Sequence, residues 1–147
     1  MIENRVVRAG IGVTALFTLA GCGLAEGLTA SSTGHVKTVG YDTGAAGKNN
    51  DDTRLPAWMP DEARSISEAI RTTGTERVLR MRLDDPALLD SCHASPSPAK
   101  PPTLPVPWWP TDEHTKATLL CDSDWYVSLA GTTVYAYRPE TVPQSSQ

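Results

Sequence analysis

The sequence predicts a small α+β domain at residues 55–139, in which one amphipathic helix packs on an antiparallel sheet of about four strands. Three observations favour this fold class. Apolar residues recur at helical spacing within residues 61–72, and they alternate with polar residues in four later segments. In addition, Cys92 and Cys121 flank a proline-rich loop and are expected to form one disulfide. A chain of 147 residues leaves room for one modest core.

The first 21 residues are expected to form a signal peptide. Arg5 and Arg8 precede an uncharged stretch, residues 9–20, which is too short to span a bilayer as a stable helix. The tetrapeptide LAGC then ends at Cys22. It resembles the lipobox of bacterial lipoproteins, in which an aliphatic residue lies three positions before a cysteine and two small residues lie between them. A membrane-spanning anchor or an apolar core helix fits the position, charge and motif less well.

The lipobox resemblance implies a covalent lipid anchor. Signal peptidase II would cut before Cys22, whose sulfur would carry diacylglycerol, with palmitate as a label for the attached acyl chains. One acyl chain is a marginal anchor at about 0.8 kcal/mol per methylene, whereas two or three chains hold the protein permanently. Arginine outnumbers lysine nine to four, which favours a GC-rich genome. We therefore expect the protein on the outer face of the cytoplasmic membrane of a Gram-positive, actinobacterial host.

Residues 22–54 are expected to form the lipidated cysteine and a flexible tether. They are rich in Gly, Ala, Ser, Thr, Asn and Asp and contain few bulky apolar residues. Such a segment cannot bury enough surface to offset the entropy lost on ordering. The alternative is an edge strand formed by Val36, Val39 and Tyr41, which alternate along the chain.

A helix is predicted at about residues 61–72. Pro60 suits its N-terminal end, and Gly74 is a natural C-terminal stop. Arg64 and Glu68 are spaced as an i,i+4 ion pair. The apolar residues that define its buried face are Ala63, Ile66 and Ile70.

Four strands are predicted from alternating patterns, with turns between the last three at residues 122–124 and 130–131. In the first strand Leu79, Met81 and Leu83 lie on one face, and Val78, Arg80 and Arg82 lie on the other. The strands are expected at residues 76–83, 117–121, 125–129 and 132–137.

Two segments are predicted to lack regular structure. Residues 95–110 contain seven prolines, which exclude a helix or a sheet interior. Residues 140–147 are expected to form a disordered tail.

The cysteines are expected to serve lipidation and a disulfide. Because Cys22 would carry lipid, Cys92 and Cys121 remain to pair outside the cytoplasm. A reactive thiol pair is one alternative, and a zinc site with His93 and His114 is another. The spacing of these four residues matches no zinc motif, so no metal or cofactor is expected.

The only cluster with an acid–base character is Asp112, Glu113 and His114. The sequence contains no GxSxG nucleophile motif, no HExxH zinc motif and no P-loop. We therefore expect these residues to form a solvated polar run before a strand, and no catalytic residue is assigned.

Charge and aromatic content indicate a binding surface. The net charge of −4 makes nucleic acid a poor partner. Arg77, Arg80 and Arg82 form a basic patch, and the last two are expected side by side on one strand face. Anionic envelope polymers or lipid head groups can bind such a patch, but arginines of this kind more often form the solvated face of a sheet. Trp108 and Trp109 lie in the proline-rich loop and can contact a partner. The other two tryptophans, Trp58 and Trp125, are expected to fill the core instead.

The sequence favours a non-enzymatic binding or accessory module of the cell envelope. Its expected partners are the membrane, through the lipid on Cys22, and an envelope protein or a cell-wall polymer. One alternative is a small hydrolase or zinc-dependent enzyme centred on His114. Another is an immunity or exclusion lipoprotein that blocks an external agent.

Overall fold

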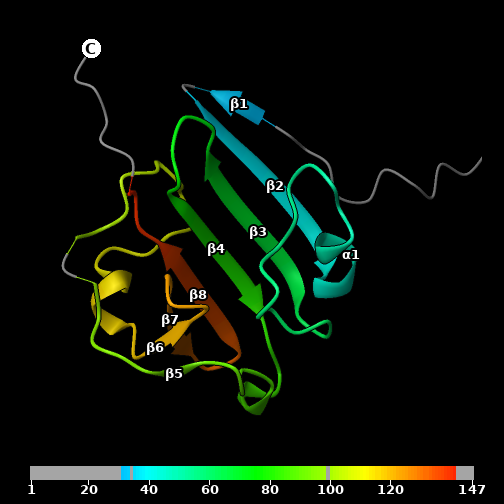
Figure 1. Ribbon diagram of the computed structural model, residues 1–147, viewed down its shortest axis with the longest axis vertical. Helices are drawn as coiled ribbons and strands as arrows, with labels where there is room; N and C mark the ends of the chain where they lie inside the picture. The colour runs from blue at the N-terminus through cyan, green and yellow to red at the C-terminus, as the bar shows by residue number, and fades with distance from the viewer. Residues whose placement is uncertain (1–30, 34, 99, 142–147) are drawn as a thin grey trace, which may run out of the picture.

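The computed structural model describes residues 31–33, 35–98 and 100–141, which form an eight-stranded antiparallel sheet (Figure 1). The strand order is β1-β2-β3-β4-β8-β7-β6-β5, so the N-terminal half of the sheet joins the C-terminal half through the β4–β8 pair. Helical structure in the described ranges is limited to α1 (Gly44–Lys48) and two short 3₁₀ turns, Pro86–Leu88 and Glu113–Lys116. The strands are β1 (Ser31–Thr33), β2 (Val36–Thr43), β3 (Arg64–Arg71), β4 (Arg77–Arg82), β5 (His93–Ala94), β6 (Leu119–Cys121), β7 (Trp125–Ala130) and β8 (Thr133–Arg138).

The predicted α+β fold is wrong because the segment expected to form the helix is strand β3. Ile66 and Ile70 both lie on its core face, with Glu68 between them at 1% exposure. Arg77 on β4 donates a hydrogen bond of 3.2 Å to Glu68 Oε1. The predicted pairing of Arg64 with Glu68 is therefore wrong as well. A buried acid interrupts the apolar alternation, and the partner that allows its burial lies on another strand.

The charge of Glu68 depends on pH near neutrality. Burial raises the pKa of this carboxyl from 4.5 to about 7, although the charge and hydrogen bond of Arg77 oppose that change. Its Oε2 atom is buried and has no hydrogen-bond partner among the described residues. On the neighbouring strand β2, burial raises the pKa of Tyr41, and the electrostatic effect of Glu68 adds to that rise.

The stability of the fold is expected to fall as pH rises from about 4.5 to about 7. Over this interval the folded chain keeps a proton on Glu68 that the unfolded chain has released, and the full loss is on the order of 3 kcal/mol. Urea unfolding of the wild type and Glu68→Gln at pH 4 and pH 8 measures it. The variant, which cannot titrate at this position, should lack this part of the pH dependence. Identical pH dependence in the two proteins would contradict the assignment.

The folded body begins earlier than predicted, so the prediction of a flexible tether is wrong for residues 36–54. Strand β2 pairs with both β1 and β3, and Val36, Val39 and Tyr41 on it are buried. The alternative of a strand here is therefore right, although the strand is interior: Val39 and Tyr41 face the main core, and Val36 faces the loop-covered side. The segment lacks enough apolar residues to fold by itself, but the sheet supplies the surface against which they pack. The signal peptide and Cys22 lie outside the described residues.

The four predicted strands are confirmed as β4, β6, β7 and β8. The β6–β7 turn places Asp122 and Ser123 in the left-handed region, at φ 48° and 65°. The β7–β8 hairpin turns through Gly131, whose φ of 64° favours glycine. Local alternation and turn chemistry predict these elements because both signals lie within a few residues of each strand.

The main core covers one face of the sheet. The segment between α1 and β3 lies across this face and buries Leu55, Trp58 and Met59. Trp58 contacts Trp125 of β7 edge to face, with ring centroids 5.8 Å apart. The expected core positions of both tryptophans are confirmed.

Among the described residues, none of the helical segments has the length and apolar character needed to span a membrane.

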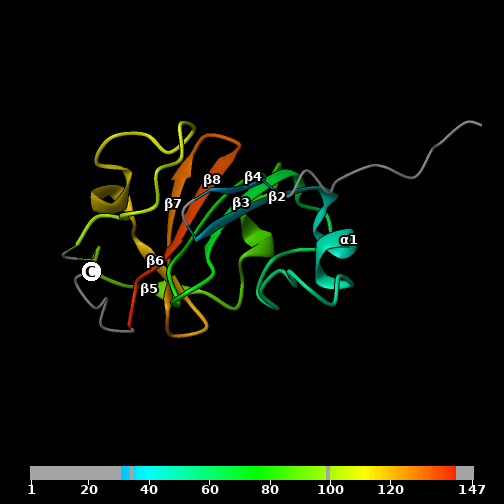
Figure 2. The same ribbon diagram turned by 90° about the horizontal axis from the view of Figure 1, so that it is seen from above.

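The proline-rich loop covers the opposite face, so the loop and α1 lie on opposite sides of the sheet (Figure 2). Trp109 of the loop packs against Tyr135 and Tyr137 of β8, with centroid distances of 5.7 and 6.2 Å. Leu104 of the loop is buried together with the sheet residues Val36, Ala69, Val78 and Tyr137.

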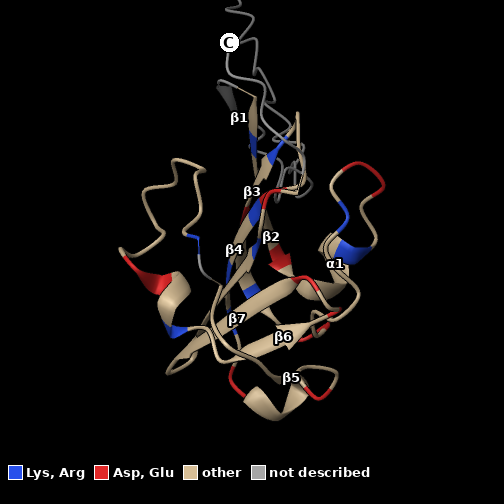
Figure 3. Ribbon diagram, turned by 60° about the vertical axis from the view of Figure 1, so that its left-hand side comes forward, with Lys and Arg blue, Asp and Glu red and all other residues tan. Residues whose placement is uncertain are grey.

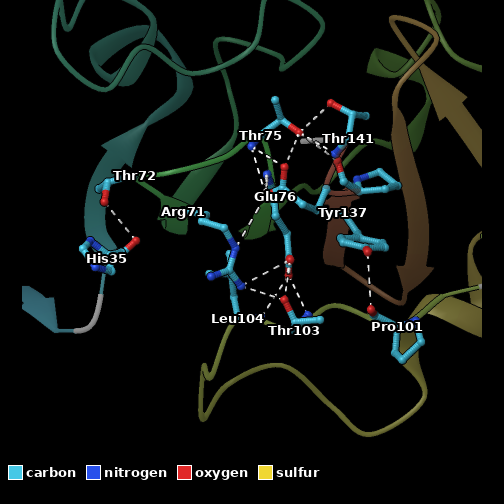
Figure 4. Close-up of polar contacts among 12 residues, drawn as sticks. His35, Arg71, Thr72, Thr75, Glu76, Pro101, Thr103, Leu104, Tyr137 and Thr141 are labelled. Atoms are coloured by element: carbon cyan, nitrogen blue, oxygen red, sulfur yellow. Dashed lines mark hydrogen bonds and ion pairs between the residues drawn. The ribbon is translucent and has the colours of Figure 1, made fainter. Parts of the chain in front are cut away.

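Glu76 fastens this loop to the sheet and is 1% exposed (Figure 4). One carboxylate oxygen accepts hydrogen bonds from the backbone N–H groups of Thr103 and Leu104, at 2.6 and 2.9 Å. The other accepts from the Thr103 hydroxyl at 2.6 Å and lies 3.4 Å from Arg71 Nη2. A single buried carboxylate therefore holds two successive residues of a loop whose described residues form no helix or strand.

The disulfide between Cys92 and Cys121 is confirmed, with a Cα–Cα distance of 4.4 Å. Cys92 precedes β5, and Cys121 ends the neighbouring strand β6. The bond therefore joins the chain at both ends of the excursion that contains the proline-rich loop. Its existence removes both thiolates from the zinc site considered as an alternative.

The C-terminal tail is shorter than predicted. Glu140 accepts hydrogen bonds from the backbone N–H of Thr75, at 3.0 and 3.1 Å. The backbone N–H of Thr141 donates to the Thr75 hydroxyl at 2.8 Å. These two residues are tied to the β3–β4 turn, and residues 142–147 lie outside the described ranges.

Candidate functional site

A groove of about 210 Å³ opens on the loop-covered face of the sheet, where β3, β4 and β8 lie side by side. We call it the Arg80 groove. The proline-rich loop leaves this part of the face open, and no residue of the loop belongs to the groove lining. The residues that line it are Ser65, Arg80, Met81, Arg82, Thr133 and Tyr135.

Strand geometry brings the two arginines together. Arg80 and Arg82 are two residues apart on β4, so their side chains point to the same face. Across the ladder Arg80 is opposite Tyr135, and Arg82 is opposite Thr133. Ser65 lies at the irregularity between β3 and β4 and has a φ of 50°. The predicted side-by-side placement of the arginines is confirmed, and both line the groove.

Trp108 of the proline-rich loop holds the guanidinium of Arg80. The guanidinium carbon lies 5.3 Å from the centroid of the Trp108 ring, which is a cation–π distance. This contact restricts the side chain without neutralising its charge. Within the described residues Arg80 has no carboxylate partner, whereas Arg71 and Arg77 are paired with buried glutamates. Arg80 therefore presents an ordered and uncompensated positive charge.

Arg82 has a carboxylate partner that an anion can replace. Its Nε atom lies 3.4 Å from Asp84 Oδ1, and the two side chains are 64% and 62% exposed. Exposed ion pairs of this kind contribute little to stability. Basic residues recur along β3 and β4, while several acidic residues lie in the surrounding loops (Figure 3). The groove is therefore locally basic in an acidic chain.

Two residues of the predicted binding surface have other roles. Trp109 packs on Tyr135 and Tyr137 of β8 and supports the loop, and it is not part of the groove lining. Arg77 lies on the opposite face of β4, where it pairs with Glu68, and the predicted three-arginine patch is therefore wrong. The hydroxyls that line the groove were missed. They come from β3 and β8, and only the alternation within residues 132–137 indicated that Thr133 and Tyr135 share a face.

The acidic run before β6 is not the solvated segment that the sequence predicted. Glu113 and His114 are 2% and 8% exposed, and Glu113 Oε1 accepts a hydrogen bond of 2.7 Å from the Ser128 hydroxyl. Lys116 Nζ lies 3.1 Å from the other oxygen. In a nucleophilic triad the imidazole lies between hydroxyl and carboxylate. Here the hydroxyl bonds to the carboxylate directly, and His114 Nδ1 has no partner among the described residues.

Within the described ranges no group of three or more His, Cys, Asp or Glu side chains is placed to hold a metal ion. Comparisons with protein-family models, curated proteins and solved structures return no match. Fold and site together define a small, disulfide-linked, antiparallel β domain with a basic surface groove backed by an aromatic side chain.

Proposed function

We propose that this protein is a lipid-anchored, non-enzymatic binding protein of the cell envelope. Lipid on Cys22 holds it at the outer face of the cytoplasmic membrane of a Gram-positive, actinobacterial host. Its ligand, an envelope protein or a cell-wall polymer, binds in the Arg80 groove. The observation that carries the binding proposal is the guanidinium of Arg80, ordered over Trp108 without a carboxylate partner among the described residues.

The contact between Arg80 and Trp108 supports binding because it reduces the entropic cost of immobilising the arginine. A flexible arginine loses side-chain entropy when it is immobilised by a ligand. Because Trp108 already restricts the Arg80 side chain, less of that entropy remains to be lost. The surrounding β ladder fixes the backbone of β4 between β3 and β8. A rigid strand surface of this kind suits recognition of a ligand whose charged group is presented in one orientation.

The test measures binding of the mature lipoprotein, solubilised in detergent, to purified cell walls by co-sedimentation. We expect the wild type to bind and Arg80→Glu with Arg82→Glu to weaken binding at least about tenfold, because one charge-assisted hydrogen bond contributes roughly 1.5–3 kcal/mol. The matched control is Arg54→Glu with Lys100→Glu. It makes the same change in net charge at two exposed positions outside the groove and should bind like the wild type.

The anchor is tested in the same cells by labelling with radioactive palmitate. The wild type should take up label and fractionate with membranes, whereas Cys22→Ala should not be labelled. Equal loss of wall binding in both double variants would contradict the role of the groove. Unlabelled wild-type protein free in the medium would contradict the anchor.

A further inference from the structure

We propose that the Arg80 groove binds the phosphate group of a phosphomonoester or phosphodiester carried by an envelope molecule. This inference rests on the proposed binding function and names the chemical class of its ligand. The shared chemistry is a tetrahedral phosphate, whether it belongs to a wall polymer or to the head group of a lipid.

The groove is rich in hydrogen-bond donors and has no carboxylate in its lining. Each guanidinium offers five N–H donors in a planar arrangement that suits oxyanions. The side chains of Ser65, Thr133 and Tyr135 add three hydroxyls, none of which is engaged by another described side chain. The lining therefore takes donor-bearing residues from three strands, β3, β4 and β8.

This arrangement fits a phosphate better than a carboxylate. The two oxygens of a carboxylate lie in one plane and are satisfied by a single guanidinium. A second arginine and three hydroxyls would then remain without acceptors. A phosphate distributes its oxygens tetrahedrally, so Arg80 and Arg82 can bind different oxygens while the hydroxyls contact the remainder. The volume of about 210 Å³ and the open mouth of the groove suit one phosphate with its neighbouring glycerol or sugar unit.

The electrostatics of the groove agree with a small anion bound locally. The Arg82–Asp84 pair is exposed and screened by solvent, so a phosphate can displace Asp84 at little cost. Arg80 needs no such displacement, since the Trp108 ring carries no net charge. An anion therefore gains two guanidinium contacts without leaving a buried acid unpaired.

The experiment is isothermal titration calorimetry of the detergent-solubilised lipoprotein with defined probes. These are inorganic phosphate, glycerophosphoglycerol as the water-soluble head group of a phospholipid, a poly(glycerol phosphate) oligomer, and polyglutamate of matched charge. We expect at least one of the two phosphodiester probes to bind at least about tenfold more tightly than polyglutamate, and inorganic phosphate to compete with it. Preference for the oligomer indicates a wall polymer, and equal or tighter binding of the head group indicates a lipid source. Either result supports a phosphate site.

The variants separate the groove from general charge. Arg80→Glu with Arg82→Glu should lose at least about tenfold in affinity for the phosphodiester probe, and Arg54→Glu with Lys100→Glu should lose little. Arg82→Glu alone changes an exposed side chain and leaves the core intact, so it keeps the test valid if the double variant unfolds. It is expected to weaken binding severalfold.

Three outcomes would overturn the inference. One is equal binding of polyglutamate and the phosphodiester probes, and another is equal loss of affinity in the two double variants. The third is groove-dependent binding to cell walls without measurable binding of any phosphate probe. In that case the proposed binding function stands, and the assignment of phosphate as its ligand fails.

Discussion

Glu76→Ala is expected to destabilise the fold by roughly 3–5 kcal/mol, the usual cost of removing one partner from a buried ionic cluster. The carboxylate is the acceptor for the backbone N–H groups of Thr103 and Leu104 and for the Thr103 hydroxyl. Removing it leaves these donors and Arg71 without their buried partner. The measurement is the free energy of unfolding in urea, with Glu62→Ala, an exposed acid, as the control.

The same substitution should release the proline-rich loop before the sheet unfolds. Leu104 of the loop is buried in one cluster with Val78 and Tyr137, and its backbone N–H donates to Glu76. Amide hydrogen exchange at Thr103 and Leu104 should therefore accelerate more than exchange within β4. Because Trp108 belongs to this loop, the Arg80 groove should bind less well too. A loss below about 1 kcal/mol with unchanged exchange at Leu104 would show that the loop is held by other contacts.

Removal of the Cys92–Cys121 disulfide is expected to cost roughly 3–4 kcal/mol, because the bond closes a loop of 29 residues in the unfolded chain. Cys121 is fully buried, so the variant should be Cys92→Ala with Cys121→Ala, which avoids placing a new polar group in the core. The melting temperature should fall by about 10 °C or more. Thermal unfolding of the wild type with and without reductant, beside the double variant, measures this loss.

Reductant should have no effect on the Cys92→Ala, Cys121→Ala protein, which serves as the control for non-specific action. Mass spectrometry after alkylation should find no free thiol at either position in protein taken from the cell surface. Two alkylatable thiols there, or equal melting temperatures for the wild type and the double variant, would contradict a stabilising disulfide.

Several parts of this fold and site can be predicted locally. Strands β4, β7 and β8 have alternating patterns and turn residues that lie within a few positions of each other. The same alternation predicts that Arg80 and Arg82 share a face. The disulfide follows from the number of cysteines left once Cys22 is assigned to lipid. That lipidation itself stays a prediction, since it depends on residues outside the described ranges.

Strand β3 could not be predicted in this way because its pattern contains Glu68 at a core position. A charged residue at that position interrupts the apolar alternation of a strand and fits the polar face of a helix. The spacing of Ile66 and Ile70 then favours a helix. Its burial is supported by Arg77, nine residues later on β4, which donates a hydrogen bond of 3.2 Å. The Arg77–Glu68 contact distinguishes the strand from the helix, and it forms only when β3 and β4 pair.

The sequence by itself determined the strands whose alternation is unbroken, their turns, the cysteine pairing and the adjacency of the two groove arginines. The tertiary structure decided the state of β3, the incorporation of β2 and the path of the proline-rich loop over the sheet. It also decided that Trp108 lies against Arg80, 28 positions away in the sequence. The physical reason is the range of the interactions. Side-chain alternation acts between near neighbours, whereas buried charges such as Glu76 are stabilised by donors as far away as 28 residues, at Leu104.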